Sequence, residues 1–338
     1  MIVQEPFSDY KAKTAYVNPS SFKGEDVYTP KHFLHKKNTV QDETLPMKLG
    51  SAFHCAVLTP QLLAPEYAFT NKKQFVAFNE SGTVNKANAE NKQIIAALQK
   101  KHNGKILLMP DEAEMIIGMA KGIKEDIPDI EYVLDRKNSL FETSIYLFAK
   151  FSENGNFECL IDLNPEDVKK MTDKERSLLL PIKTRSDYFH NRKGYATDLK
   201  STKCAHPMKF MYDVEKYGYH MQVAMTLDML NCQFKTTRYN TFWLIAVENH
   251  PPYAAIKLNC TNQMISEGQE DYINRLEHIH KSYNANHFKG YEVISQYRTF
   301  DNDNNELRNF NTCDIDLPPS YYNRKKYITE RYPFMKPF

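Results

Sequence analysis

The chain has 338 residues, of which 41% are hydrophobic and 25% are charged, a composition typical of a globular protein with a sizeable core. With 44 basic against 42 acidic side chains its net charge is +2, so overall charge does not indicate a nucleic-acid binder. No apolar run approaches the ~20 residues of a membrane helix. The N-terminus also lacks a secretory signal pattern, so we expect a cytoplasmic protein without a membrane partner.

Six cysteines are spread along the chain without a Cys-x-x-Cys pair, at positions 55, 159, 204, 232, 260 and 313. This spacing argues against a zinc ribbon and against an iron–sulfur cluster, because both need clustered thiolates. We expect reduced and mostly buried thiols. No Gly-x-x-x-x-Gly-Lys-Ser/Thr loop is present, so ATP is not expected as a cofactor.

The first 135 residues are predicted to be mainly helical. Polar residues 1–45 contain a predicted turn at Asn18–Ser21. Apolar side chains at helical spacing predict helices at 47–58, near 87–101 and from Pro110 to about Lys124.

Residues 136–300 are predicted to form a mixed sheet with helices around it. Strands are predicted at 140–151, 157–162, 182–189, 194–202, 242–247 and 253–258. The run 242–247 is apolar at every position, as in a central strand buried on both faces. Helices are predicted at 207–230, interrupted at Gly218, and at 268–283. With an irregular tail over 301–338, the pattern predicts a single α/β domain whose mixed central sheet is flanked by helices.

The segment KTRSDYFHNRKGYATDLKSTK, residues 183–203, carries the candidate chemistry. On a strand over 194–202, Asp198 and Lys200 point to the same face, about 7 Å apart. A hairpin across residues 191–194 would bring Asp187 back beside Asp198. Two converging carboxylates suit Mg²⁺, and a lysine beside them can position or help deprotonate a water molecule. Taken alone, such a pattern is more often a surface salt bridge.

Several further segments occur in a fixed order around this one. They are LGSAFHCAVLTP (49–60), ETSIY (142–146), KTRSD (183–187), TDLKSTK (197–203), KYGYHMQVA (216–224) and, within 241–256, TFWLIAVE with PPYAAI. In this order they resemble the nuclease domain of RecE (exonuclease VIII) from prophage recombination systems. That family is related to lambda exonuclease and to RecB-type nucleases, and it belongs to the PD-(D/E)xK superfamily.

The resemblance implies a catalytic centre built on five residues. Asp187 and Asp198 match metal-binding acids, and Lys200 matches the catalytic lysine. His54 matches a histidine at the metal site, although its local pattern also fits a hydrogen-bonded core histidine. Glu142 matches an acid that completes the metal shell or a second one.

The resemblance also implies residues around that centre. Gln222 matches a polar residue lining the catalytic site, and its helix face is predicted to point into the sheet. Arg185, Tyr217 and Tyr219 are expected to contact the substrate, the two tyrosines alternatively being packing residues.

The chain departs from the family in two places. Residues 153–181 are longer than the expected short turn, and this segment creates a rival first metal acid, Asp162. We prefer Asp187 because of its spacing to Asp198. In addition, Thr226 occupies the position, four residues after Gln222, at which a tyrosine is common in that family.

The function implied by the resemblance is a Mg²⁺-dependent exodeoxyribonuclease, with Mn²⁺ as a possible substitute. It would digest linear duplex DNA from its ends, 5′ to 3′, for recombination by single-strand annealing. The same resemblance implies a ring-shaped homo-oligomer and a single-strand annealing protein as partner. The alternatives are a catalytically inactive module of this fold that binds DNA or protein, and an endonuclease of the same fold. The lack of a cysteine cluster argues against an iron–sulfur CRISPR-type exonuclease.

Overall fold

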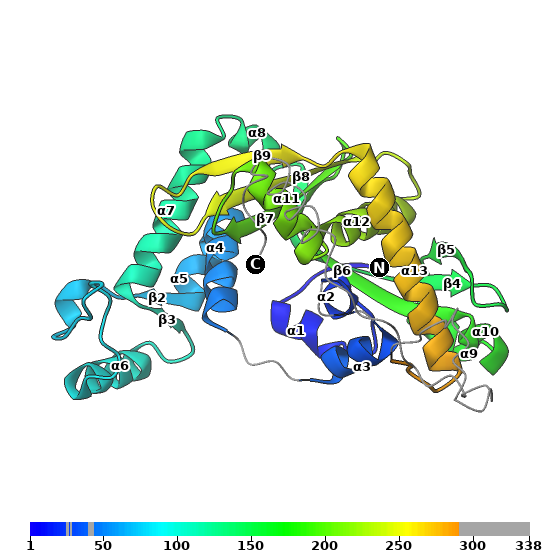
Figure 1. Ribbon diagram of the computed structural model, residues 1–338, viewed down its shortest axis with the longest axis horizontal. Coiled ribbons are helices and arrows are strands. Elements are labelled where there is room, and N and C mark those ends of the chain that lie inside the picture. Colours follow the sequence, from blue (N-terminus) through cyan, green and yellow to red (C-terminus); the bar gives the residue numbers. More distant parts are fainter. Residues whose placement is uncertain (25–26, 28, 40–43, 291–338) are drawn as a thin grey trace, which may run out of the picture. The chain divides into compact units, whose positions relative to one another are not determined.

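The computed structural model describes residues 1–24, 27, 29–39 and 44–290 (Figure 1). Residues 1–288 form one compact unit, and of the second unit, 289–338, the described residues are Lys289 and Gly290. The predicted tail over 301–338 and Cys313 lie outside the described part, and the single domain stays a prediction. None of the described helices is long and apolar enough to cross a membrane.

A seven-stranded mixed sheet forms the centre of the described residues (Figure 1). Its order is β1 (Ile2–Gln4), β4 (Ser139–Phe151), β6 (Leu179–His190), β7 (Tyr195–Thr202), β8 (Thr241–Glu248) and β9 (Ala255–Asn259), with β5 (Phe157–Ile161) paired to β4. Strands β7 and β8 run parallel, and the other pairs are antiparallel. The predicted mixed sheet is therefore confirmed.

Two hydrophobic clusters occupy the two faces of the sheet. The first contains side chains of β4, β6 and β8 packed with α2 (Pro19–Phe22), α3 (Pro30–Asn38), α11 (Pro207–Lys216), α12 (Tyr219–Phe234) and α13 (Asn262–Asn284). The second packs side chains of β7 and β8 against α4 (Leu45–Leu58), α7 (Pro110–Asp126) and α8 (Ile130–Val133). Strand β8 contributes Leu244 to the first cluster and Ile245 to the second, so it is buried on both faces as predicted.

The remaining elements flank this layered centre. They are α1 (Phe7–Ala12), α5 (Pro60–Glu66), β2 (Tyr67–Phe69), the short 3₁₀ helix η1 (Lys72–Gln74), α6 (Ala89–Lys101), β3 (Ile106–Leu108), α9 (Pro165–Lys170) and α10 (Asp173–Ser177). Strands β2 and β3 pair in parallel as a separate two-stranded sheet. Tyr67 of β2 and Leu108 of β3 join the second cluster. The insertion at 153–181 thus contains β5, α9 and α10.

The predicted break at Gly218 is confirmed, and it has a local and a long-range cause. Gly218 has a φ of +61° and precedes the first residue of α12. An added Cβ there would lie 2.8 Å from the backbone nitrogen of Gly24 and 2.8 Å from the Cβ of Lys23. Glycine is therefore required both by the left-handed backbone and by the close approach of the N-terminal segment.

Three expectations from the sequence are wrong. The predicted turn at Asn18–Ser21 is the start of α2, where the Asn18 side chain accepts a hydrogen bond of 2.9 Å from the Ser21 N–H and caps the helix. Helix α13 begins at Asn262 after the N-cap Thr261, ahead of the predicted 268. Of the five described cysteines, all of them free, two are buried and three are partly or fully exposed.

Candidate active site

Strands β6 and β7 form a hairpin and then separate, and this fork positions the two aspartates. Their pairing is limited to Tyr188 with Thr197 and Phe189 with Ala196. Beyond these pairs, β6 continues along β4 and β7 continues along β8. At the point of separation the Asp187 carboxylate accepts a hydrogen bond of 2.8 Å from the Leu199 N–H. A side chain thus satisfies a backbone donor that the strand ladder leaves open.

Strand β4 is irregular opposite this fork. Its pairs with β6 include Phe141 with Tyr188 and Thr143 with Ser186, but the intervening Glu142 makes no ladder pair with the residue opposite. Glu142 has a φ of +47°, a left-handed backbone that is uncommon outside glycine and recurs at functional sites. The side-chain alternation also breaks here, since Phe141 joins the second cluster and Ile145 the first.

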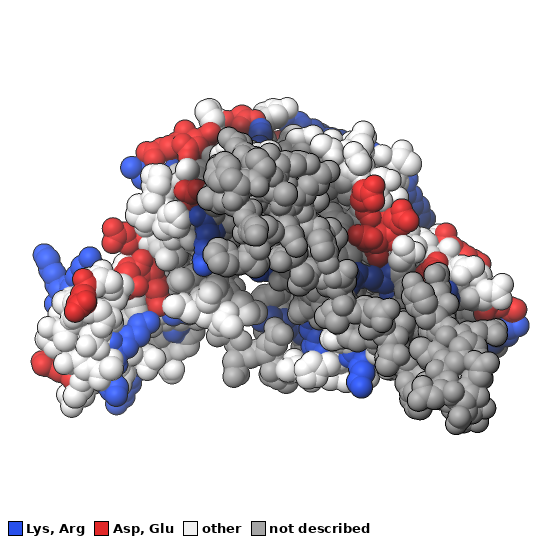
Figure 2. Space-filling view, viewed as in Figure 1, with Lys and Arg blue, Asp and Glu red and all other residues white. Residues whose placement is uncertain are grey.

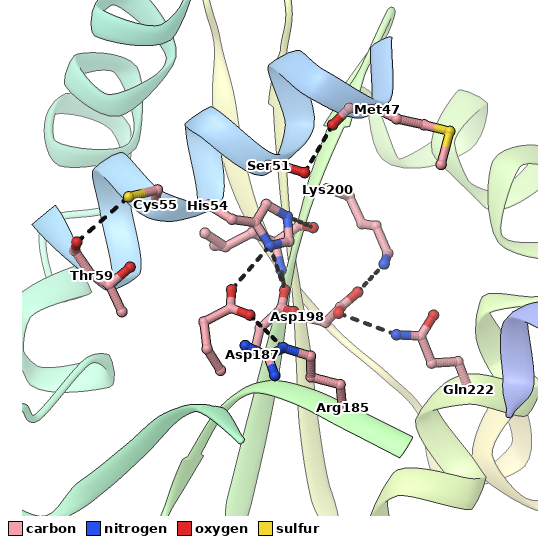
Figure 3. Close-up of polar contacts among 12 residues, drawn as sticks. Met47, Ser51, His54, Cys55, Thr59, Arg185, Asp187, Asp198, Lys200 and Gln222 are labelled. Carbon is pink, nitrogen blue, oxygen red and sulfur yellow. Dashed lines mark hydrogen bonds and ion pairs between the residues drawn. The ribbon is translucent and has the colours of Figure 1, made fainter. Parts of the chain in front are cut away.

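His54 of α4 lies beside Asp187 (Figure 3), and it also meets the carboxylate of Glu142. Its Nδ1 lies 3.4 Å from Asp187 Oδ2 and 3.6 Å from Glu142 Oε1, and its Nε2 lies 3.1 Å from the Leu199 carbonyl. One ligand atom from each of the three side chains falls within 4.8 Å of the other two. A nitrogen and two carboxylate oxygens at this spacing form a donor set that fits a divalent cation.

The ionisation of these groups indicates a shortage of positive charge. Burial raises the pKa of Asp187 well above its ordinary value, and the neighbouring negative charge of Asp198 raises it further. Burial alone would lower the pKa of His54, but the carboxylates of Asp187 and Glu142 outweigh it and raise that pKa to about 9. His54 therefore carries a proton at neutral pH, in a place where a metal ion would compete with that proton.

Asp198 is held by a different set of partners. It is buried, forms an ion pair with the Lys200 ammonium, and accepts a hydrogen bond of 3.3 Å from Gln222 Nε2 (Figure 3). Burial opposes its ionisation, but Lys200 lowers its pKa below the ordinary value. The predicted metal-binding set thus divides: His54, Glu142 and Asp187 gather, and Asp198 lies beside them facing Lys200.

Lys200 lies between Asp198 and an aromatic ring. Its Nζ is 4.5 Å from the centroid of Tyr219. Burial lowers the pKa of Lys200, but Asp198 outweighs burial and raises it above the ordinary value. Lys200 is therefore a cation suited to stabilising negative charge, and its raised pKa disfavours the alternative of accepting a proton from water.

Arg185, predicted to contact the substrate, holds three groups of the protein, and its contact with substrate stays a prediction. Its Nε donates to Glu142 Oε2 at 2.9 Å, and its Nη1 donates to the Glu5 carbonyl at 3.0 Å and to Ser144 Oγ at 3.2 Å. The first of these contacts restrains the Glu142 carboxylate. Arg185 thus orients a candidate ligand.

The predicted aromatic residues lie at the edge of the same site. The Tyr217 and Tyr219 rings are 5.6 Å apart, and Tyr217 is 45% exposed. Thr226 lies deeper and shares a buried hydrogen bond of 3.2 Å with Thr184, so it packs α12 onto β6. The rival acid Asp162 accepts hydrogen bonds from the N-terminal ammonium at 2.8 Å and from Gln233 at 2.7 Å, outside the His54 group.

Lys23 was not predicted from the sequence. Its ammonium donates to Gln222 Oε1 and lies 5.1 Å from the centroid of Tyr219. Burial lowers its pKa to about 7, and the positive charge of Lys200 contributes. A lone lysine far from the main motif gives no sequence signal, because its place depends on how the N-terminal segment packs.

The comparison with known families bears on the central part of the chain. Residues 168–293 match a family described as a PDDEXK-like domain of unknown function (DUF3799). This range includes the fork with Asp187, Asp198 and Lys200, and also Gln222. The chain has a PD-(D/E)xK nuclease-like fold. The fold predicted from the sequence is thereby confirmed, while the match says nothing about RecE in particular.

Two solved structures are similar at low sequence identity. One is a protein from Eubacterium rectale described as a "putative exonuclease", 12% identical, with a TM-score of 0.46 over 83% of this chain and 88% of that one. The other is a protein designated SSO0001, 13% identical, with a TM-score of 0.22 over 56% of this chain and 67% of that one. No curated protein sequence matches this chain.

Proposed function

We propose that this protein is a metal-dependent nuclease that hydrolyses phosphodiester bonds in DNA. The observation that carries the proposal is the convergence of His54, Glu142 and Asp187 beside the Asp198–Lys200 pair. These residues meet at a strand fork in a sheet of PD-(D/E)xK-like fold.

The candidate ligands are His54, Glu142 and Asp187, with Asp198 adjacent. A Mg²⁺ or Mn²⁺ ion bound there supplies Lewis acidity toward the phosphate and acidifies the attacking water. His54 must lose its proton to act as a ligand, and Arg185 holds Glu142 in place through its 2.9 Å hydrogen bond.

The protein's own cations act on the negative charge of the reaction. Lys200, kept protonated by Asp198, lies where it can stabilise charge that develops on the phosphate oxygens. Gln222 donates to Asp198 and so limits the orientation of that carboxylate. The exposed ring of Tyr217 offers a stacking surface to a nucleobase at the edge of the site.

The finer proposal rests on the sequence resemblance to RecE. It is that the enzyme is a cytoplasmic exodeoxyribonuclease that digests linear duplex DNA 5′ to 3′ with Mg²⁺, as a ring-shaped oligomer working with a single-strand annealing protein. Acidic and basic side chains are mixed on the described surface shown in Figure 2. Because basic and acidic side chains are nearly balanced over the whole chain, 44 against 42, we expect contacts with DNA to depend on the cations of the site.

One assay tests both levels of this proposal. Duplex DNA labelled at one end is incubated with the protein with and without Mg²⁺, beside a relaxed covalently closed circle. We expect progressive loss of the linear duplex and survival of the circle, and no cleavage by Asp198→Ala. Rapid loss of the closed circle would make the enzyme an endonuclease. Binding without any cleavage, in Mg²⁺ and in Mn²⁺, would make it an inactive module.

A further inference from the structure

The N-terminal segment 17–24 is fastened to the body of the protein on two sides. Val17 exchanges backbone hydrogen bonds of 2.8 Å with Pro181 and Lys183 at β6. From α13, Arg275 Nη1 donates to the Phe22 carbonyl at 2.6 Å and also to the Val27 carbonyl. Both Val17 and Phe22 are buried in the first hydrophobic cluster. The segment therefore presents its next side chain, Lys23, from a fixed backbone.

Lys23 begins a chain of polar contacts that ends at Asp198. Its ammonium donates to Gln222 Oε1, and Gln222 Nε2 donates to Asp198 Oδ1 at 3.3 Å. An ammonium can only donate and a carboxylate can only accept, so both ends select the same orientation of the amide. The glycine at position 218 permits this approach, since a Cβ there would meet Lys23 and Gly24.

We propose that Lys23 is a positioning residue of the active site, which holds the Gln222 amide against Asp198. This inference rests on the proposed nuclease function and deepens it. Lys23 acts through Gln222, so it affects the rate of the chemical step and leaves substrate affinity largely unchanged. It also makes the N-terminal segment part of the site, although the family match begins at residue 168.

A double-mutant cycle tests this role. We compare Lys23→Met, Gln222→Ala and the double variant by steady-state cleavage of duplex DNA, well below each variant's melting temperature. Lys23→Met should lower kcat about 10–100-fold, as changes behind a metal site commonly do, with KM within about threefold. The double variant should be no slower than Gln222→Ala alone, because Lys23 has nothing left to position. Lys23→Arg should recover most of the rate, since a guanidinium also only donates.

The control is Lys100→Met, on the exposed face of α6, which should leave kcat and KM unchanged. Additive losses in the double variant would overturn the proposal. A second contradicting result would be a raised KM for Lys23→Met, together with a slope of log binding constant against log salt concentration that is smaller by about one. That result would assign Lys23 to a substrate phosphate. Unchanged kcat in Lys23→Met would also overturn the proposal. If the unmodified protein cuts no DNA, the nuclease function itself fails, an outcome distinct from these.

Discussion

The two sides of the candidate site differ in their balance of charge. One side, the acidic half, consists of His54, Glu142 and Asp187, and the other, the basic half, consists of Lys23, Asp198, Lys200 and Gln222. In the acidic half the pKa of Asp187 is raised by burial and by Asp198, and that of His54 is raised to about 9. In the basic half the pKa of Asp198 is lowered by Lys200 despite burial, and the pKa of Lys23 is lowered to about 7 by burial and by Lys200.

The difference suggests what each half is prepared to receive. In the acidic half Asp187 and His54 bind protons more tightly than isolated side chains would. His54 and Arg185 outweigh burial and lower the pKa of Glu142, so that carboxylate stays charged and the group is suited to a cation. The basic half has the protonated Lys200 and the partly protonated Lys23 beside one carboxylate, and is suited to an anion. A phosphodiester placed between a divalent ion and Lys200 would satisfy both halves, and the following experiments separate their contributions.

Removing the metal should have the largest effect on cleavage, because it takes away the cation that we propose the acidic half binds. We expect no measurable cleavage in EDTA, and recovery with Mg²⁺ or Mn²⁺. Ca²⁺ should support DNA binding without cleavage, since it accepts longer bonds and irregular shells and misplaces the water. Gel assays of binding and cleavage in parallel check this. Efficient cleavage in EDTA would rule out the metal site.

Changes in the basic half should come next. Asp198→Ala and Lys200→Ala should each lower kcat on the order of a thousandfold or more, through loss of several kcal/mol of transition-state stabilisation. Folding and DNA binding should be largely retained, as measured by circular dichroism and by binding in Ca²⁺. Either variant keeping more than a tenth of the wild-type rate would contradict the assignment.

His54 gives a pH-dependent test of the acidic half. Its pKa in the folded, metal-free protein is about 9, above its ordinary value of about 6.5. The stability it contributes is therefore complete below the ordinary pKa and is lost as pH rises through about 9. Metal binding depends on pH in the opposite direction: it strengthens as pH rises, because His54 must be neutral to act as a ligand. Between pH 7 and 9 the Mg²⁺ concentration for half-maximal rate should fall, by up to about tenfold per pH unit if one proton is displaced.

The matched variant for this test is His54→Gln. It should cleave slowly, need more Mg²⁺, and lose most of the pH dependence of metal binding. Without metal, the melting temperature of the variant should be closest to that of the wild type near pH 9 and furthest below it near pH 6. A variant that melts several degrees lower at every pH, with normal metal dependence, would make His54 a core residue.

The smallest effect is expected at the rival acid. Asp162→Asn should leave cleavage within about twofold of wild type, because its carboxylate binds the N-terminal ammonium and Gln233. The free energy of unfolding of this variant should differ from that of the wild type by at most about 1 kcal/mol, as for other partly exposed ion pairs. A large loss of activity in the same end-labelled assay would make Asp162 the first metal-binding acid. The division of the candidate site into an acidic and a basic half would then be wrong.

The parts of the fold that sequence reasoning predicted have local causes. Alternation in 194–202 places Asp198 and Lys200 on one face, and the short loop after β6 returns Asp187 to the same place. Gly218 breaks the helix because its backbone is left-handed. The positions of the two aspartates and of Lys200 follow from residues a few positions apart, while the close approach at Gly218 also involves Lys23 and Gly24.

The parts that were missed depend on contacts between distant segments. Glu142 is unpaired in the sheet because its backbone turns left-handed, which strand periodicity does not signal. Arg185 was predicted to contact the substrate; the residue opposite it on β4 is Ser144, and its guanidinium binds the carboxylate of Glu142, two residues away on that strand. Lys23 reaches Gln222 through the packing of α2 on α12, with Arg275 of α13 binding the Phe22 carbonyl, and no sequence pattern connects them.

The contact between Lys23 and Gln222 also constrains when the site can form. The two residues are 199 positions apart, and the segment carrying Lys23 is anchored by Arg275, further along still. Closing a loop of that length costs more entropy than closing the β6–β7 hairpin, so long-range contacts of this kind tend to form late in folding. During synthesis the ribosome releases Lys23 long before α12 and α13 exist. We therefore expect a nascent chain to remain without a complete site until the last described helix has been made and docked.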